Sequence, residues 1–174
     1  MEHKLADELI EAVAHGDMGA LEILYYHMYR EIYLYIFSLV HNRCEAEDLA
    51  QDTFMRVYKY APNFTPQGKG KSWIYKIANH LALTYLKSNR NATSISEITP
   101  FDSGLEENAV NSQALLSAIN KISDSEQQIV LMHAVSGLTL GEIAEITNLP
   151  LGTVKWKHAN ALKKLRKILG ENFI

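Results

Sequence analysis

The chain has 174 residues, of which 47% are hydrophobic and 21% are charged, a composition typical of a soluble globular protein. No apolar run approaches the roughly 18 residues of a membrane span, and the acidic N-terminus lacks the pattern of a signal peptide, so we expect a cytoplasmic protein. Cys44 is the only cysteine, which excludes an internal disulfide and a metal site built from several cysteines.

The net charge of −3 conceals an uneven distribution along the chain. Residues 1–52 carry a formal charge of −8, residues 53–96 carry +7 without one acidic side chain, residues 97–145 carry −7, and residues 146–174 carry +5. Two separate basic stretches on an acidic protein favour contact with phosphate groups at two places. Two solvated basic helix faces would give the same pattern, so charge alone leaves both interpretations open.

The first half of the chain predicts four helices around one core. A short helix is expected near the N-terminus, and apolar residues at three- and four-residue steps from residue 17 to 40 predict a second helix with Asp17 as its N-cap. A third helix begins near Glu45 and is stopped by Pro62. Residues 62–71 contain two prolines and two glycines and predict a loop. A fourth helix follows, from about residue 72 to residue 88.

A linker and three further helices are predicted in the second half. Residues 89–112 lose the helical periodicity and are rich in Ser, Thr and Asn, as expected of an extended segment. Ser123 with Glu126, and Thr139 with Glu142, have the spacing of capping boxes that open two helices. A last helix should run from about residue 151 to residue 169. We therefore expect an all-α protein with two small helical domains joined by a flexible linker, with boundaries at residues 1–90, 91–112 and 113–174.

Residues 137–165 have the spacing of a helix-turn-helix. This motif needs a small residue where its helices cross, a turn residue that tolerates positive φ four positions later, and an apolar residue six positions beyond that. Ala144, Asn148 and Val154 meet the requirement. The second helix of such a unit enters the major groove, and an amphipathic hairpin with a solvated basic face is the alternative. The side chains predicted to contact DNA are Thr153, Lys155, Trp156, Lys157, Asn160, Lys163 and Lys164.

Three stretches of the chain resemble the sigma factors of bacterial RNA polymerase. Residues 123–169 resemble region 4, whose helix-turn-helix reads the −35 promoter element. Residues 46–60 resemble the region 2 helix that docks on the clamp helices of the largest polymerase subunit, and residues 71–90 resemble the helix that opens and reads the −10 element. The order of these stretches, the linker and the absence of a middle domain are similar to the extracytoplasmic-function (ECF) group.

The resemblance implies an alternative sigma factor and not an enzyme. Its partners would be core RNA polymerase, through the clamp helices and the flap, promoter DNA and an anti-sigma factor. No cofactor, metal ion or small-molecule substrate is expected. Acidic and amide groups with an apolar centre would bind the polymerase: Glu47, Asp48, Gln51, Asp52 and Phe54. Basic, polar and aromatic groups would hold the opened −10 strand: Lys69, Lys71, Trp73, Tyr75, Lys76, Asn79 and His80. By the same resemblance, the loop of residues 63–70 would embrace one flipped base.

Several positions depart from the pattern of the family. In the melting helix, His80 and Thr84 stand where relatives often carry Asn, and Asp or Asn, respectively. In the recognition helix, Trp156, Lys157, Ala159 and Asn160 stand where Ser, Arg, His and Arg, respectively, are common. Because arginine supplies the commonest bidentate contact to guanine, the usual −35 consensus is not expected here.

Other functions have less support in the sequence. His41 and Cys44 could contribute to a metal site, but two ligands are too few, and no Gly-rich phosphate loop or Ser nucleophile motif is present. A transcriptional regulator that binds duplex DNA as a dimer could use the same C-terminal module. It would not need the basic stretch at residues 53–96, and a protein-interaction adaptor would need neither basic stretch. Trp73 remains open between a core residue and a base platform.

Overall fold

The computed structural model describes residues 1–89 and 117–169, and all regular structure within these ranges is helical. The all-α prediction is therefore confirmed. The expected linker, residues 91–112, lies outside the described residues.

The N-terminal domain contains the four expected helices. Their bounds are α1 (His3–Ala14), α2 (Met18–Val40), α3 (Arg43–Tyr60) and α4 (Gly70–Asn89), with a short 3-10 helix at Ala61–Asn63. Asp17 caps α2 as predicted, because its Oδ1 accepts the backbone N–H groups of Gly19 at 2.8 Å and Ala20 at 3.1 Å. Helix α4 begins two residues earlier than residue 72, so the loop before it is shorter than expected.

The C-terminal domain contains a helix-turn-helix. Its helices are α6 (Asp124–Ala134), α7 (Leu140–Thr147) and α8 (Leu151–Leu169). Both predicted capping boxes are present, at the starts of α6 and α7. Asn148 ends α7 in the left-handed region, with φ 54°, and Val154 is completely buried. The turn residue and the sealing residue of the motif therefore lie where the spacing predicts them.

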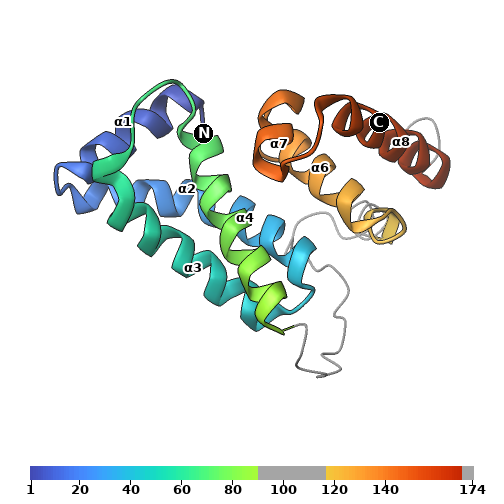
Figure 1. The fold of residues 1–174 in the computed structure, drawn as a ribbon, viewed down its shortest axis with the longest axis horizontal. Coiled ribbons are helices and arrows are strands. Elements are labelled where there is room, and N and C mark those ends of the chain that lie inside the picture. The colour runs from blue at the N-terminus through green and yellow to red at the C-terminus, as the bar shows by residue number, and fades with distance from the viewer. Residues whose placement is uncertain (90–116, 170–174) are drawn as a thin grey trace.

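The two domains share one continuous apolar core, although the sequence favours a separate core for each. Helix α6 packs against α2, and α7 packs against α4 (Figure 1). The N-terminal core thereby continues into the second domain through Ile129, Leu131, Met132, Leu138, Ile143, Ile146 and Val154. A smaller cluster joins the segment before α6 to α6 and α8, and consists of Ala118, Ile119, Ile122, Val130, Ala161 and Leu165. Helix α8 stays at the surface of this assembly, with Lys155 exposed.

Candidate nucleic-acid and polymerase interfaces

Helix α8 presents an exposed basic face. Lys155 and Lys163 are exposed, and the indole of Trp156 is 65% exposed, which is unusual for so large an apolar side chain. No acidic residue occurs between Leu151 and Leu169. An open groove of about 610 Å³ follows the same helix and is lined by Ala159, Leu162, Lys163, Arg166 and Lys167. These features give α8 the charge that phosphate contact requires and an apolar group among the cations.

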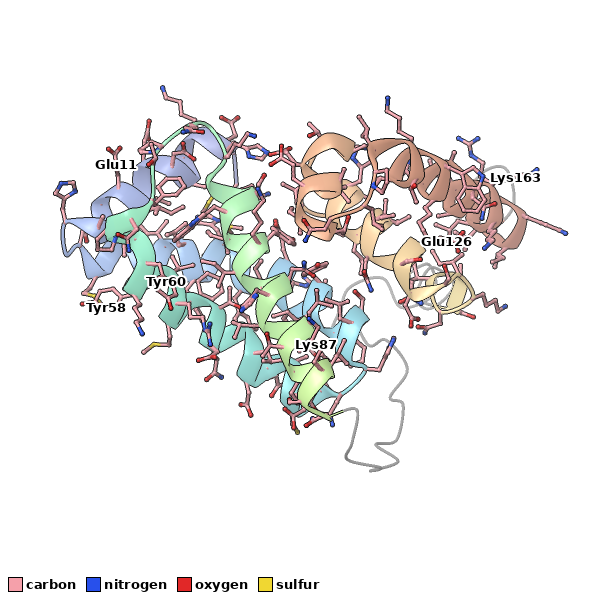
Figure 2. All side chains as sticks on the ribbon, in the orientation of Figure 1. Glu11, Tyr58, Tyr60, Lys87, Glu126 and Lys163 are labelled. Carbon is pink, nitrogen blue, oxygen red and sulfur yellow. The ribbon has the colours of Figure 1, made fainter. Side chains whose placement is uncertain are left out.

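Three of the predicted −35 residues already have partners on α6. The Lys157 Nζ donates to the Oγ of Ser125 at 2.7 Å, while Asn160 Nδ2 and Lys164 Nζ donate to the Glu126 carboxylate at 2.6 Å and at 2.8–2.9 Å. Figure 2 shows Glu126 on α6 and Lys163 on α8. Lys163 is not part of this set of hydrogen bonds. Lys157, Asn160 and Lys164 therefore hold the recognition helix on its own domain.

Glu126 is the centre of this contact between α6 and α8. It is only 2% exposed, and burial by itself would raise the pKa of its carboxyl group. Hydrogen bonds from Lys164, Ser123 and Asn160 outweigh the burial and lower the pKa to about 2. The carboxylate is thus charged at neutral pH and fixes the orientation of α8.

Helix α4 turns one face toward the helix-turn-helix domain. Lys71, Tyr75 and Asn79, three of the predicted −10 residues, are 2%, 0% and 8% exposed. Lys71 Nζ donates to the carbonyl oxygen of Ser136 and lies 3.3 Å from Glu31 Oε2, while the Tyr75 hydroxyl bonds to the Ser136 hydroxyl. These side chains therefore meet the second domain in this structure, and burial raises the pKa of the Tyr75 hydroxyl.

Asn79 completes the buried contact between the domains. Its Nδ2 donates to the carbonyl oxygen of Ile146 on α7 at 2.7 Å, and its Oδ1 accepts from the Tyr35 hydroxyl at 2.9 Å. Since both the oxygen and the nitrogen of this side chain have a partner, neither polar atom of the amide is buried without a hydrogen bond.

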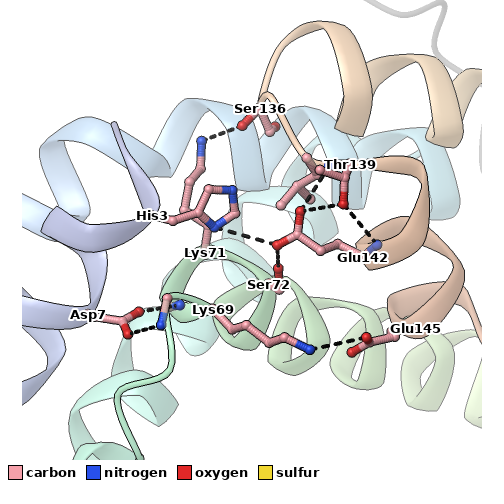
Figure 3. Close-up of polar contacts among 12 residues, drawn as sticks. His3, Asp7, Lys69, Lys71, Ser72, Ser136, Thr139, Glu142 and Glu145 are labelled. Atoms are coloured by element: carbon pink, nitrogen blue, oxygen red, sulfur yellow. Dashed lines mark hydrogen bonds and ion pairs between the residues drawn. The ribbon is translucent and has the colours of Figure 1, made fainter.

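Two carboxylates of α7 lie against the basic start of α4. Glu145 pairs with Lys69 at 3.2 Å and with Lys76 at 3.0 Å, and these lysines lower the pKa of its carboxyl group. Glu142 accepts a hydrogen bond from the Ser72 hydroxyl and lies 3.5 Å from His3 Nδ1 on α1 (Figure 3). Helix α7 thus places negative charge against two of the lysines that are predicted to contact the −10 strand.

The outward face of α4 borders an open groove. The groove has a volume of about 300 Å³ and lies beside α3, whose Arg56 and Tyr60 form part of its wall. Trp73 packs partly against the core, as the core interpretation expects, and it also lines this groove, so its role as a base platform stays a prediction. The full lining is Arg56, Tyr60, Trp73, Lys76, Ile77 and His80.

Sequence reasoning placed three of these lining residues in the −10 site and missed Arg56 and Tyr60. Arg56 belongs to the acid-free basic stretch, and Tyr60 follows it by one helical turn. Residues four positions apart lie on the same face of a helix, so this spacing could have placed Arg56 and Tyr60 together. The combination of aromatic and basic groups suits a single strand, whose bases stack on rings while cations follow the backbone.

The predicted polymerase-binding face of α3 is exposed. Glu47, Asp48, Gln51 and Asp52 all face solvent. Phe54 does not, because it is 3% exposed and its ring centroid lies 5.1 Å from that of Tyr25.

Besides Tyr60, which is 38% exposed and lines the groove, the exposed apolar side chains of α3 are Met55, at 65%, and Tyr58, at 45%, which sequence reasoning did not select. Both follow the acidic residues along the helix, and Figure 2 labels Tyr58 on α3. On α2, the rings of Tyr25, Tyr29 and Tyr33 stack in sequence with centroids 4.8 and 6.3 Å apart. Burial raises the pKa of Tyr29, with smaller contributions from its tyrosine neighbours and from Glu47 and Asp48, which places this row of rings beside the acidic face.

The residues that the structure describes contain neither a cluster of metal ligands nor a membrane-spanning helix. Over residues 1–89 and 117–169, no three or more His, Cys, Asp and Glu side chains come together as a set of metal ligands, and this includes the neighbourhood of His41 and Cys44. Within the same ranges, every helix is too short or too polar to cross a lipid bilayer.

Comparison with known proteins identifies the family. The sigma-70 region 2 model matches residues 24–92, and the sigma-70 region 4 model matches residues 112–165. The ECF RNA polymerase sigma factor SigW of Bacillus subtilis is 30% identical over 177 residues, and the alignment covers 92% of this chain and 94% of SigW. The chain belongs to the ECF sigma factors. The resemblance found in its sequence is thereby confirmed.

Another relative and two solved structures agree with this assignment. BldN of Streptomyces coelicolor, an ECF sigma factor, is 28% identical, and the alignment covers 95% of this chain but 66% of BldN. The chain thus spans just under two thirds of that relative. The sigma factor RpoE of Bartonella quintana, solved with the anti-sigma factor NepR, has a TM-score of 0.70 at 19% identity and covers 85% of this chain and 95% of its own. CnrH, solved with the cytosolic domain of CnrY, has a TM-score of 0.66 at 17% identity, with coverage of 95% and 97%. These two structures show the same fold.

Proposed function

We propose that this ECF sigma factor binds core RNA polymerase through α3 and directs transcription initiation by contacting promoter DNA with both domains. The observation that carries the proposal is that each family-matched region presents its own basic surface, one on α8 and one along the groove between α3 and α4, where Arg56 and Lys76 supply the charge. A ligand-sensing or dimerisation domain would have no need for the second surface. In this role the protein supplies promoter recognition, the polymerase supplies the chemistry, and both act in the cytoplasm.

The −35 element is assigned to the outer face of α8. Lys155 and Lys163 would contact DNA, and Trp156 would present an apolar surface to base edges, such as the methyl group of thymine. Lys157, Asn160 and Lys164 contribute indirectly, because their bonds to Ser125 and Glu126 on α6 orient the helix. Promoter preference should therefore depend most strongly on the exposed residues at the start of α8.

The −10 strand is assigned to the groove between α3 and α4 and to the adjoining loop of residues 63–70. Trp73 and His80 line that groove in the structure as it stands. Lys71, Tyr75 and Asn79 can reach DNA only after α7 and the Ser136 turn have moved away from α4. The structure thus corresponds to a closed form, and use of the full predicted −10 set requires the two domains to separate.

Core polymerase is assigned to the acidic face of α3, with Met55 as an apolar contact. Carboxylates around an apolar centre suit a basic surface such as that expected of the clamp helices, and region 4 would contact the flap. Control by an anti-sigma factor is supported by the two similar structures, each of which was solved with a partner of its own. Neither the groove nor α8 requires a small-molecule substrate for these roles.

In vitro transcription with purified core polymerase tests the function directly. A library of DNA fragments is transcribed with core polymerase alone, with the chain alone, and with both together. We expect discrete transcripts only from the combination. A dimeric regulator would instead bind duplex DNA without polymerase and give no new start sites, and that result would contradict the proposal.

A further inference from the structure

Helix α1 lies outside the stretch matched by the region 2 model, yet it is bonded to the loop before α4. The side chain of Asp7 on α1 is 6% exposed. Its Oδ2 accepts the backbone N–H of Gly68, and its Oδ1 accepts the N–H of Gly70, both at 2.6 Å (Figure 3). Hydrogen bonds to a charged acceptor are about twice as strong as neutral ones. A carboxylate at the first residue of α4 also complements the helix dipole.

The backbone geometry shows that this contact is closely fitted. A Cβ atom on Gly70 would lie 2.7 Å from Asp7 Oδ1 and 2.9 Å from the carbonyl carbon of Ala6, which is too close for any other residue. Gly68 has φ +69°, a conformation that favours glycine. Glycine at positions 68 and 70 is therefore what allows this loop to pack closely against α1.

The other end of the loop is fixed as well. The Phe64 ring centroid lies 5.0 Å from that of Trp73, and the Phe64 N–H bonds to the carbonyl oxygen of Ala61 at 3.0 Å. Trp73 in turn lines the groove assigned to the −10 strand. The exposed residues 65–69 consequently lie beside that groove, between the contact of Phe64 with Trp73 and the bonds of Gly68 and Gly70 to Asp7.

We propose that Asp7 is a positioning residue for base recognition in the −10 element. It would touch no DNA, but its two bonds hold the loop in the one conformation that selects a flipped base. This inference rests on the proposed function of the loop. Recognition of a base by hydrogen bonds depends on geometry held to about 0.5 Å. Release of the loop should therefore reduce discrimination between bases more than it reduces overall affinity.

The experiment uses the chain assembled with core polymerase. Single-stranded −10 oligonucleotides are first selected from a random library by the wild-type holoenzyme, and each position is then replaced by the other three bases. Fluorescence anisotropy gives the affinity ratio between the preferred and the replaced base. A well-placed base contact should give a ratio of about 10 or more.

Asp7→Asn preserves the size of the side chain but turns an amide N–H group toward a backbone N–H. We expect the highest ratio to fall to about 3 or less, with affinities for polymerase and for −35 duplex unchanged within about twofold. Gly68→Ala strains the same loop and leaves the carboxylate in place, so it should give the same loss. If Asp7→Asn fails to fold, Asp7→Glu takes its place in the same assay, because it keeps the charge but not the length of the side chain and should show the same loss. Glu8→Gln, at a site on α1 whose carboxylate lies 3.8 Å from Lys4, is the matched control and should change nothing.

The outcomes separate the inference from the function on which it rests. If Asp7→Asn weakens all oligonucleotides equally and retains the ratio, Asp7 is merely structural and the inference is wrong. If Gly68→Ala alone loses discrimination, the loop matters but Asp7 does not position it. If the wild-type holoenzyme prefers no base at any position, the proposed function of the loop fails instead.

Discussion

Glu145 offers the most direct test of the closed arrangement. Its carboxylate pairs with Lys69 and Lys76 at the edge of the contact between α7 and α4. Both lysines belong to the predicted −10 set, so under the proposed function DNA would compete with Glu145 for the same cations. Glu145→Gln should therefore shift the equilibrium toward separated domains and release both lysines for the DNA backbone.

The structure limits the size of this effect. All three side chains are about half exposed, at 47%, 51% and 46%, and exposed pairs contribute about 0.3–1 kcal/mol each. Two such pairs give about 1 kcal/mol, or about fivefold in the equilibrium between closed and open forms. The buried bonds of Lys71 and Asn79 to the second domain remain. The variant should consequently be more open, but not constitutively open.

The assay measures the affinity of the full chain for a labelled −10 single strand at about 50 mM and 500 mM salt. The apparent affinity rises with the fraction of open molecules, so we expect Glu145→Gln to bind up to about fivefold more tightly at low salt. The gain should largely disappear at high salt, where exposed pairs are screened. Glu11→Gln removes the same charge from an exposed site on α1 and controls for the general effect of charge on DNA binding. Equal gains in both variants, or no gain in Glu145→Gln, would refute the competition.

Three further outcomes follow from the other surfaces. Lys155→Glu combined with Lys163→Glu should reduce promoter-specific transcription by at least about tenfold, while co-purification with core polymerase is retained. Asp48→Lys combined with Asp52→Lys should do the reverse and weaken that co-purification by about tenfold. Glu126→Gln should lower the free energy of unfolding by about 3 kcal/mol at pH 7, as expected for a carboxyl whose pKa falls from 4.5 to about 2. Because this pKa is depressed in the folded state, the contribution is complete above about pH 4.5 and is lost as the pH falls toward 2.

Each of these outcomes has a control and a contrary result. Lys121→Glu, an exposed charge reversal in the second domain, should leave transcription intact. Unchanged recovery of polymerase with the paired α3 variant would contradict the docking assignment, and Glu22→Lys on α2 controls for charge reversal alone. For Glu126→Gln, denaturation is measured from pH 7 to pH 3. A stability difference that is the same at both ends would show that the carboxylate charge is not responsible.

Local features of the fold were predictable because they depend on residues close together in sequence. The capping box of Thr139 and Glu142 and the left-handed Asn148 are each determined within one helical turn, and both are present. The helix-turn-helix was predictable for the same reason. Its motif specifies three positions, and the buried Val154 satisfies the last of them.

The contact between the domains was not predictable in this way. Lys71 lies in a basic stretch and was interpreted as a phosphate contact, but it meets the backbone of Ser136, 65 positions away. Asn79 similarly meets the carbonyl oxygen of Ile146, 67 positions away. A helical pattern indicates that a residue lies on a given face but does not indicate what covers that face. Phe54 illustrates the same limit. It is buried, whereas Met55, the next residue along α3, is exposed, and the sequence pattern did not distinguish the two.

The closed form also orders the steps by which DNA could engage this protein. Trp73 and His80 line an open groove, whereas Lys71, Tyr75 and Asn79 lie under the second domain. Under the proposed function, a single strand would therefore enter the groove before the domains separate, and its phosphates would then compete with Glu145 for Lys69 and Lys76. Each cation that DNA captures removes one contact between α7 and α4, so binding and opening promote one another. Once apart, the domains remain tethered, and this raises the effective concentration of α8 near the second promoter element.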